Sequence, residues 1–377
     1  MSRIRSLRVD DIPLVVDLFV ESFRSGKHVS TEALQSYFHS VYFESPWSNP
    51  VDLPSLVRDE GPGKITAFLG VFPRRVRLDG KTLQAVVVGN FTVRPDASGR
   101  RDPFAAIGLT KHCLAGRQDI SISDSAAESS RKIWEGCGGE TCHLYSYQWF
   151  RPLRPMSFAI DRRAQGRPNS IGQKVTRALC GAADLIVGHR AYQAEATAEL
   201  PTTVVPLEPE DLCVAIQQSS YQLIPDYAEG TLDWLLSMAA KKRGHGDFVQ
   251  SIVKANDGKT LGWYIYYRVP NGISHVLQIE ALPGKLELVM NALVTDADSV
   301  QSSGLFGKLP PRFMRDLSNA RCVFRSGPWT LLHARRTGYL QPFYRGEACF
   351  SGLEGEGWLR FIGDDFPAHS GDPRKRA

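Results

Sequence analysis

The sequence predicts a mixed α/β fold in which two modules stand in tandem and are joined by a helical linker. Three observations predict it. Helical and strand patterns alternate along the chain, hairpin turns separate long strand-like segments, and one opening pattern occurs twice. In that pattern Leu207 and Asp211 stand where Leu7 and Asp11 stand in the first half. A single match of this kind also arises by coincidence in α/β proteins, and that alternative stays open.

The first half opens with a short strand at residues 4–9 and a helix that begins at Asp11 and Pro13, because these residues are typical of a helix N-cap and first turn. Asp79-Gly80 predicts a tight turn between two long strands, since both residues tolerate a positive φ. The elements predicted around and after this turn are strands at 64–78 and 82–93, a helix at 104–114, a strand at 119–123 and a helix at 126–137.

The second half repeats this order. Asp257-Gly258 and Asn271-Gly272 predict two hairpin turns. The elements expected there are strands at 248–254, 260–268 and 274–282 and a helix at 286–298. We therefore expect a first domain at 1–155, a helical linker at 156–201, a second domain at 202–365 and a flexible tail at 366–377.

The linker is rich in Arg, Ala, Gly and Gln and contains no strand pattern. Within it, apolar residues from Ile171 to Ile186 share one helical face. This face predicts a helix packed between the domains, with a helix lying on a membrane surface as the alternative.

Composition excludes several classes of protein. The 377 residues are 42% apolar and 23% charged, which is typical of a folded globular chain. The net charge of +5 does not indicate a nucleic-acid-binding protein. The seven cysteines show no paired metal or disulfide spacing, and no apolar run reaches the roughly 20 residues that span a bilayer. We expect a cytoplasmic protein with reduced thiols and no integral membrane segment.

One segment resembles a known phosphate-binding element. A strand that ends at 91–95, a short loop at 96–103 and an apolar helix look like the acyl-CoA-binding segment of the GNAT (Gcn5-related) N-acyltransferases. Ser130, Trp134 and Gly138 stand where that superfamily often has Ala, Tyr and Gly. The second half resembles it more faintly, and residues 350–361 look like the last strands of a second module. The whole chain is similar to the tandem-GNAT proteins.

The resemblance implies a site for acetyl-CoA or another acyl-CoA in the first half. The residues that it assigns to this site are Phe91, Val93, Gly99, Arg100, Arg101, Phe104 and Ala105. Backbone amides at a helix N-terminus bind a pyrophosphate in such a loop. Here the family's loop pattern is degraded, so we expect Arg100 and Arg101 to contact the phosphates by charge. The alternative is an ordinary surface loop. In the second half a short turn with Gly284 and Lys285 replaces the loop, and we expect no CoA site there.

Two carboxylates are candidate catalytic residues, because acyl transfer to an amine needs a proton acceptor. Asp124 follows a central strand, and its alternative role is the N-cap of the next helix. Glu280 lies on an apolar strand, where burial would raise its pKa, unless it faces solvent at an edge. Trp134 occupies the place of the family's usual acid and cannot act as an acid. Either another group such as Tyr145 or Tyr147 serves, or the thiolate leaves without help, or the site is inactive. The nine histidines show no paired spacing, so no metal is expected.

The resemblance implies an acyl-CoA-dependent N-acyltransferase, an N-acetyltransferase in its simplest form, that acts on a small-molecule amine or amino sugar. The alternatives are a non-catalytic GNAT-like binding or scaffold protein, and a transferase that takes its acyl group from an acyl carrier protein or an aminoacyl-tRNA. A basic cluster at 100–132 would suit an acidic carrier protein, and is otherwise a solvated face.

Overall fold

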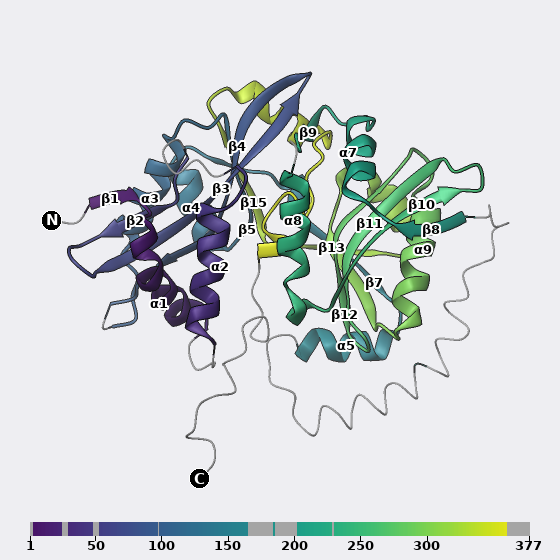
Figure 1. Ribbon diagram of the computed structural model, residues 1–377, viewed down its shortest axis with the longest axis horizontal. Coiled ribbons are helices and arrows are strands. Elements are labelled where there is room, and N and C mark those ends of the chain that lie inside the picture. The colour runs from purple at the N-terminus through teal and green to yellow at the C-terminus, as the bar shows by residue number, and fades with distance from the viewer. Residues whose placement is uncertain are drawn as a thin grey trace, which may run out of the picture.

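The chain folds around two mixed β-sheets that lie side by side (Figure 1). The computed structural model describes residues 3–24, 29–47, 53–96, 98–164, 184, 202–227 and 230–359. Within this part, no helix is long and apolar enough to cross a membrane.

The first sheet has the strand order β1-β2-β3-β4-β5-β15-β6, and β9 pairs with β3 outside this path. These strands are β1 (Arg3–Ser6), β2 (Leu56–Asp59), β3 (Ile65–Leu78), β4 (Lys81–Val93), β5 (Ile120–Ala126), β15 (Trp329–Ala334), β6 (Glu140–Thr141) and β9 (Leu223–Pro225). β3 and β4 form a long hairpin, and Asp79 and Gly80 both have a positive φ at its turn, as the sequence predicts.

Helices cover both faces of the first sheet. The helices are α1 (Ile12–Phe23), α2 (Thr31–Phe43), α3 (Pro103–Leu114) and α4 (Glu128–Gly136). Side chains of β3 and β4 alternate between the faces: Phe72 and Val87 join the core of α1 and α2, whereas Val71 and Val88 join the core of α3. The strands are therefore apolar on both faces, which explains why they read as nearly continuous apolar runs.

The second sheet has the order β14-β7-β13-β12-β11-β10-β8. Its strands are β14 (Val323–Ser326), β7 (Tyr147–Pro152), β13 (Gly304–Lys308), β12 (Ile273–Ala281), β11 (Thr260–Arg268), β10 (Asp247–Ala255) and β8 (Thr202–Pro206). The helices of this part are α5 (Pro155–Ala164), α7 (Pro209–Gln217), α8 (Thr231–Ala240), α9 (Leu286–Ser299), α10 (Met314–Asn319) and α11 (Gln341–Arg345). Short 3-10 turns lie at Val9–Asp11, Leu144–Ser146, Arg243–His245, Pro311–Phe313, Thr337–Leu340 and Gly357–Leu359.

The two sheets exchange a strand. β7 comes from the first half of the sequence and pairs with β13 and β14 in the second sheet. β15 comes from the second half and pairs with β5 and β6 in the first sheet. Each incoming strand occupies the same position, next to the end of the order. The two sheets therefore have equivalent orders that fit tandem modules, although neither is built from one half alone.

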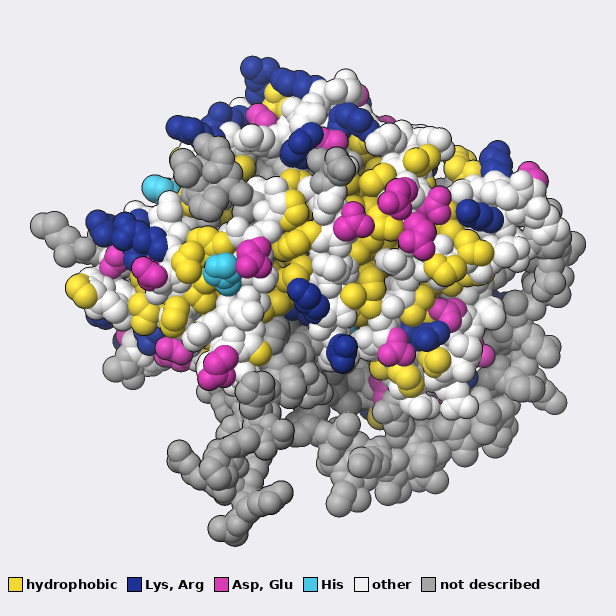
Figure 2. Space-filling view, viewed as in Figure 1, with side chains coloured by type: hydrophobic (Ala, Val, Ile, Leu, Met, Phe, Trp, Pro, Cys, Tyr) yellow, Lys and Arg dark blue, Asp and Glu magenta, His cyan; other side chains and the backbone are white. Residues whose placement is uncertain are grey.

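One apolar core joins the halves. It contains Phe38 of α2, Leu235 of α8 and Trp358 near the end of the described chain, together with side chains from both sheets. Charged side chains of both signs lie over the face in Figure 2, with Asp and Glu gathered around α7. This mixture agrees with the small net charge.

Several sequence predictions differ from the structure. Residues 350–359 were expected to form closing strands, and this is wrong, because they form consecutive turns and a 3-10 turn between the sheets. The helix α2 has a Ser30 cap that accepts a hydrogen bond from Ala33 N at 3.2 Å, and the analysis of the sequence missed it. The linker helix predicted around 171–186 lies outside the described residues apart from Asp184. The division of the chain at 155 and 202 stays a prediction, because strands cross it in both directions.

Candidate functional site

The site lies where β4 and β5 separate. These parallel strands are paired from Ala85 with Ile120 to Val87 with Ile122, and they diverge beyond that point. The chain segment 350–359, which we call the closing segment, enters the gap between them. A strand gap of this kind exposes backbone groups of β5 that need hydrogen-bond partners.

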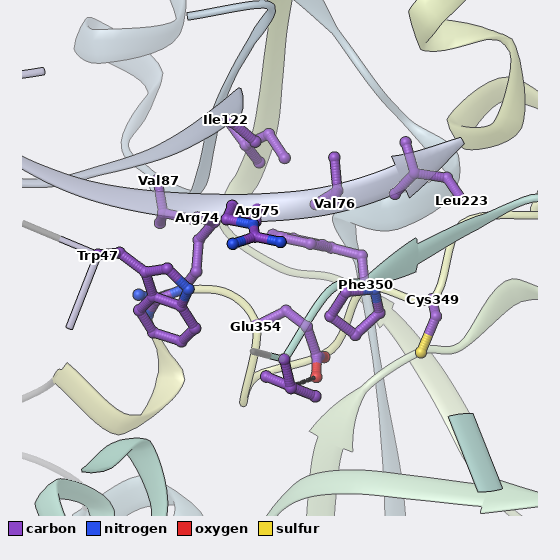
Figure 3. Close-up of a pocket in the computed structure, with 13 residues that line it drawn as sticks. Trp47, Arg74, Arg75, Val76, Val87, Ile122, Leu223, Cys349, Phe350 and Glu354 are labelled. Carbon is purple, nitrogen blue, oxygen red and sulfur yellow. Dashed lines mark hydrogen bonds between the residues drawn. The ribbon is translucent and has the colours of Figure 1, made fainter. Parts of the chain in front are cut away.

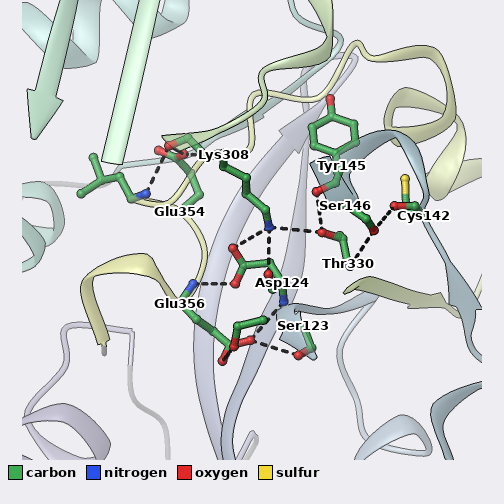
Figure 4. Close-up of polar contacts among 12 residues, drawn as sticks. Ser123, Asp124, Cys142, Tyr145, Ser146, Lys308, Thr330, Glu354 and Glu356 are labelled. Atoms are coloured by element: carbon green, nitrogen blue, oxygen red, sulfur yellow. Dashed lines mark hydrogen bonds and ion pairs between the residues drawn. The ribbon is translucent and has the colours of Figure 1, made fainter. Parts of the chain in front are cut away.

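Glu356 of the closing segment supplies these partners (Figure 4). Its Oε1 accepts hydrogen bonds from Ser123 Oγ and Asp124 N, both at 3.0 Å, and its Oε2 accepts one from Ser125 Oγ at 2.6 Å. On the other side of the gap, a Cβ placed on Gly89 of β4 would lie 2.8 Å from Oε2. Only glycine leaves room for the carboxyl group there.

The Glu356 carboxyl group is buried, and its pKa is raised to about 7. Burial is the main cause, because desolvation disfavours the charged form, and the neighbouring Asp124 carboxylate adds repulsion. The hydrogen bonds from Ser125, Asp124 N and Ser123 act in the opposite direction. The group can therefore gain and lose a proton near neutral pH.

Asp124 forms a buried ion pair that spans the two sheets. Its Oδ2 lies 2.6 Å from the Nζ of Lys308 at the end of β13, and its Oδ1 accepts a hydrogen bond from Glu356 N at 2.8 Å. Lys308 Nζ also donates to Thr330 Oγ1 on β15 at 3.2 Å. The alternative role of Asp124 as a helix cap is wrong, because α4 has Ala127 at its N-cap and no side chain caps it.

Polar contacts from both halves hold the closing segment and Ala348, which shortly precedes it. Tyr145 Oη donates to Ala348 O at 2.7 Å and accepts from Ala348 N at 3.1 Å. Glu354 accepts hydrogen bonds from Tyr227 Oη at 2.6 Å, from Gln278 Nε2 at 2.9 Å and from Ser351 N at 2.8 Å. The position of Glu356 is therefore set by groups on both sides of the gap.

Glu280 lies in the second sheet, beyond the point where β12 and β13 stop pairing. It is buried and accepts a hydrogen bond from Tyr221 Oη at 2.7 Å. Burial raises its pKa to about 8, against the opposing effects of Tyr221 and Arg312. The expected burial and raised pKa are confirmed, and the alternative of a solvent-facing edge residue is wrong. Its catalytic role stays a prediction.

The loop predicted to bind phosphate is folded on itself. Asp96 Oδ1 accepts hydrogen bonds from Ser98 N at 2.8 Å and Arg100 N at 3.0 Å, and Gly99 has a φ of +79°. Asp102 caps α3 by accepting a hydrogen bond from Phe104 N at 2.9 Å, and it is also paired with Arg58. A carboxylate thus already occupies the helix N-terminus, which disfavours a pyrophosphate on these amides.

The other residues assigned to this loop have different environments. Val93 and Ala105 are buried in the core beside α3, and Phe91 packs against it. Phe104 is 81% exposed, and Arg100 and Arg101 are exposed as well. The two arginine side chains are accessible to an anion in solution. Their role stays a prediction, like that of the whole set.

Trp134 and the two tyrosines considered as acids are engaged with partners other than Glu356. Trp134 is buried, and its Nε1 donates to Leu332 O of β15 at 2.9 Å, so it anchors α4 to the exchanged strand. Tyr145 is engaged with Ala348, and Tyr147 lies on β7 in the second sheet. Among the described residues, no group of His, Cys, Asp and Glu could hold a metal ion.

A pocket adjoins the site between the halves (Figure 3). The empty volume within and in front of the pocket is about 430 Å³, and this volume includes open solvent. Ala85 and Val87 of β4 and Ile122 of β5 line it, so it ends where the two strands separate. Arg74 and Glu354 are the buried charged groups in its wall.

The sequence reasoning missed Glu356, Lys308 and Arg74. Glu356 lies in a glycine-rich stretch, Ser351-Gly352-Leu353-Glu354-Gly355-Glu356-Gly357, whose alternating glycines permit close packing. A Cβ on Gly355 would lie 2.3 Å from Asp124 Oδ2, which shows how closely the backbone approaches β5. Acidic residues between glycines are the signal that could have identified the closing segment.

Comparison with known structures decides the fold. Among the solved structures that match most of the chain are a conserved protein of unknown function from Enterococcus faecalis V583, described as a probable N-acyltransferase, and GCN5-related N-acetyltransferases from Anabaena variabilis ATCC 29413 and Kribbella flavida. The chain has the GNAT fold.

The likeness to these GNAT structures is one of fold, since identities are low. The Enterococcus protein is 14% identical with a TM-score of 0.57, and the match covers 89% of this chain and 73% of that one. The Anabaena protein is 13% identical with a TM-score of 0.54 and the same coverages, and the Kribbella protein is 12% identical with 0.50, 88% and 70%. No protein-family profile and no curated protein sequence matched the chain. The GNAT fold expected from the sequence is confirmed.

Proposed function

We propose that the chain is an N-acyltransferase that takes an acyl group from acyl-CoA and transfers it to a small amine. The observation that best supports this function is a buried carboxyl group, Glu356, at the point where β4 and β5 separate. Its pKa of about 7 suits a general base at neutral pH. The solved neighbours with this fold are described as N-acetyltransferases and a probable N-acyltransferase, which agrees with the proposal.

In this reaction the amine nitrogen attacks the thioester carbonyl carbon, and the C–S bond breaks as the C–N bond forms. Glu356 accepts the proton that the amine loses. Ser123, Ser125 and the amide of Asp124 fix the orientation of this carboxylate and stabilise it after the amine binds. In this role Glu356 replaces Asp124, whose oxygens are taken by Lys308 and by the amide of Glu356.

Tyr42 is our candidate for the acid that protonates the leaving thiolate. A Cβ placed on Gly70 of β3 would lie 2.5 Å from the hydroxyl oxygen of Tyr42. Gly70 pairs with Gly89 of β4, against which the Glu356 carboxyl group packs. Tyr42 Oη accepts a hydrogen bond from Asn90 Nδ2 at 2.9 Å, so its own proton is available to another acceptor. Burial raises the pKa of this phenol, which keeps it protonated at neutral pH.

The proposal is tested by acyl transfer from a series of acyl-CoAs to a panel of small amines. Glu356→Gln should lower turnover by about 10²–10⁴-fold, the usual contribution of a general base. Turnover of the wild-type chain should rise with pH through about 7, because only the deprotonated carboxylate accepts a proton. The matched control is Glu347→Gln, an exposed residue shortly before the closing segment. Full turnover in Glu356→Gln would contradict this assignment.

A second candidate function is a non-catalytic GNAT-like binding protein. It is favoured by Asp102, because this carboxylate caps α3 where a pyrophosphate would otherwise bind. The same observation favours a donor whose acyl-pantetheine arm comes from an acyl carrier protein. Wild-type turnover with acyl carrier protein and none with acyl-CoA would select the carrier as donor. No turnover with either donor, despite measurable binding, would select the non-catalytic function.

A further inference from the structure

The pocket beside Glu356 has an apolar wall and a buried guanidinium group. Aliphatic and aromatic side chains from β3, β4, β5, β9 and the closing segment form most of its lining. Arg74 of β3 is only 8% exposed and lies beside Trp47 in Figure 3. The guanidinium carbon is 4.4 Å from the centroid of the Trp47 ring and 5.8 Å from that of Trp358.

Several buried N–H groups in this cluster have no hydrogen-bond partner within the described part of the chain. They are Nε and Nη2 of Arg74, Nε1 of Trp47 and Nε1 of Trp358. Arg74 Nη1 alone is used, donating to Pro73 O at 3.1 Å. All of these unsatisfied atoms are donors. A buried donor without a partner costs about 1–3 kcal/mol, so the cluster lacks an acceptor and not merely a neighbour.

The guanidinium group has one carboxylate, Glu354, near enough to raise its pKa, but forms no ion pair within the described part of the chain. Glu354 faces the same pocket, but its oxygens accept from Tyr227, Gln278 and Ser351, and no ion pair with Arg74 is formed among the described residues. Burial lowers the pKa of Arg74 to about 10, which still leaves it cationic at neutral pH. A carboxylate satisfies both requirements, because it brings a negative charge and two acceptor oxygens that match the guanidinium fork.

The pocket and the proposed base share one face of β4. Ala85 and Val87 line the pocket, and Gly89, the next residue on that face, lies against Glu356. Alternate residues of a strand are roughly 7 Å apart. A small molecule with its carboxylate on Arg74 therefore extends along β4 toward Glu356.

We infer that the acceptor is a small amine that bears a carboxylate, and that Arg74 binds this carboxylate. The inference rests on the proposed function for the fate of the amine, and on the pocket alone for the carboxylate. Arg74 is then a specificity-determining residue. The aromatic rings of Trp47 and Trp358 exclude water from the ion pair and so strengthen it.

The test measures binding first, without any acyl donor. Glycine, β-alanine, γ-aminobutyrate, ε-aminocaproate, L-alanine and L-phenylalanine are titrated into the full-length chain by calorimetry, each beside its own carboxamide. This panel varies the length between amine and carboxylate. At least one acid should bind about tenfold or more tightly than its amide, the scale of one charge-assisted contact.

Variants then assign the preference to Arg74. Arg74→Gln should abolish the difference between acid and amide, and Arg74→Lys should keep part of it, because the charge remains and the fork is lost. Arg77→Gln, on the same strand but outside the pocket lining, is the matched control and should keep the full difference. Melting temperatures show whether each variant is folded.

The outcomes separate this inference from the proposed function. Equal binding of acids and amides, no binding by any acid, or an undiminished preference in folded Arg74→Gln would each overturn the carboxylate site. If the acids bind through Arg74 but no acyl group is transferred, the site stands and the proposed function fails. If acids and amides are acylated with equal kcat/KM, the function stands and the inference fails.

Discussion

The two strand gaps of this molecule look alike in topology and differ in what fills them. In the first sheet, the side chain of Glu356 enters between β4 and β5 and is held by the hydroxyls and amide of Ser123–Ser125. In the second sheet, the backbone of the closing segment pairs with β12 itself, since Gly352 N donates to Leu277 O at 2.9 Å. The carboxyl group of the closing segment enters the first gap, whereas its main chain pairs at the second, where the buried carboxyl group, Glu280, belongs to β12 itself.

The loops that follow β4 and β12 also differ, in their length and in the cationic side chains that they expose. After β4 a long loop exposes Arg100 and Arg101 before α3 begins. After β12 only a tight turn with Gly284 at a φ of +72° leads into α9, and Lys285 at its N-cap makes no capping hydrogen bond with its side chain. This difference is consistent with the proposed function, which assigns the reaction to the first sheet.

The largest expected effect on the free energy of unfolding comes from the buried ion pair between Asp124 and Lys308, which joins the two sheets. Asp124→Asn removes the carboxylate that pairs with Lys308 in a buried setting, and breaking such a pair costs about 3–5 kcal/mol. Denaturant unfolding measures the loss. The more exposed pair of Arg131 with Glu128 is the matched control, and Glu128→Gln should cost much less than Asp124→Asn, because solvent screens this pair.

A smaller loss in Asp124→Asn than in Glu128→Gln would show that the pair does not hold the sheets together. Combining Asp124→Asn with Lys308→Met should recover part of the stability, because no buried lysine is then left without its carboxylate partner.

The second largest expected effect is the pH dependence of stability that Glu280, the buried carboxyl group of the second sheet, produces. Its pKa is about 8 in the folded chain and near 4.5 when unfolded, so the folded state retains a proton that the unfolded state has lost. Its contribution to the free energy of unfolding therefore falls as pH rises from about 4.5 to about 8.

Glu280→Gln does not titrate, so its stability should exceed that of the wild-type chain by a few kcal/mol at pH 9, since each pKa unit corresponds to about 1.4 kcal/mol. Melting temperatures at pH 5 and 9 measure this, with exposed Glu287→Gln on α9 as control. Equal pH dependence of Glu280→Gln and wild type would show that the carboxyl is ionised in the folded state.

Much of the fold could be predicted because its signals are local. Asp79 and Gly80 at one turn and Asn271 at another adopt the positive φ angles that their residue types favour, and β11 has the predicted bounds. The helix at 286–298 appears as α9 at Leu286–Ser299. These elements depend on neighbours in sequence, which a reader of the sequence can see.

The strand exchange and the site could not be predicted in this way. Nothing near β5 indicates that β15 is its partner, because the pairing joins Ala126 to Trp329. Glu356 gains its raised pKa from burial against β5, which is a property of the assembled fold. The sequence singles out Asp124 because the end of a strand is a local signal, whereas nothing local in the sequence indicates that the closing segment brings Glu356, the base that we propose, to the same gap.

The charge of the loop after β4 gives a third prediction. Arg100→Glu combined with Arg101→Glu should weaken CoA binding by about tenfold or more, since both side chains are exposed and would repel its phosphates. Calorimetry of the full chain with CoA measures it. Lys111→Glu, later on α3, is the control. Unchanged affinity in the double variant would place CoA elsewhere.

The last prediction concerns stoichiometry. The turn before α9 is short and brings a single cationic side chain, Lys285, so we expect the second sheet to add no CoA site, and a titration should give one site per chain. Two equivalent sites would remove the functional difference between the gaps.

The exchange of β7 and β15 also bears on how the chain is synthesised. β5 is a sheet edge until β15 arrives, and β15 lies near the end of the described chain. An unpaired edge strand is a template for pairing with other chains. During translation the first sheet stays open at β5 until residues 329–334 have left the ribosome, so the nascent chain has a long interval in which a chaperone that covers this edge would improve its yield.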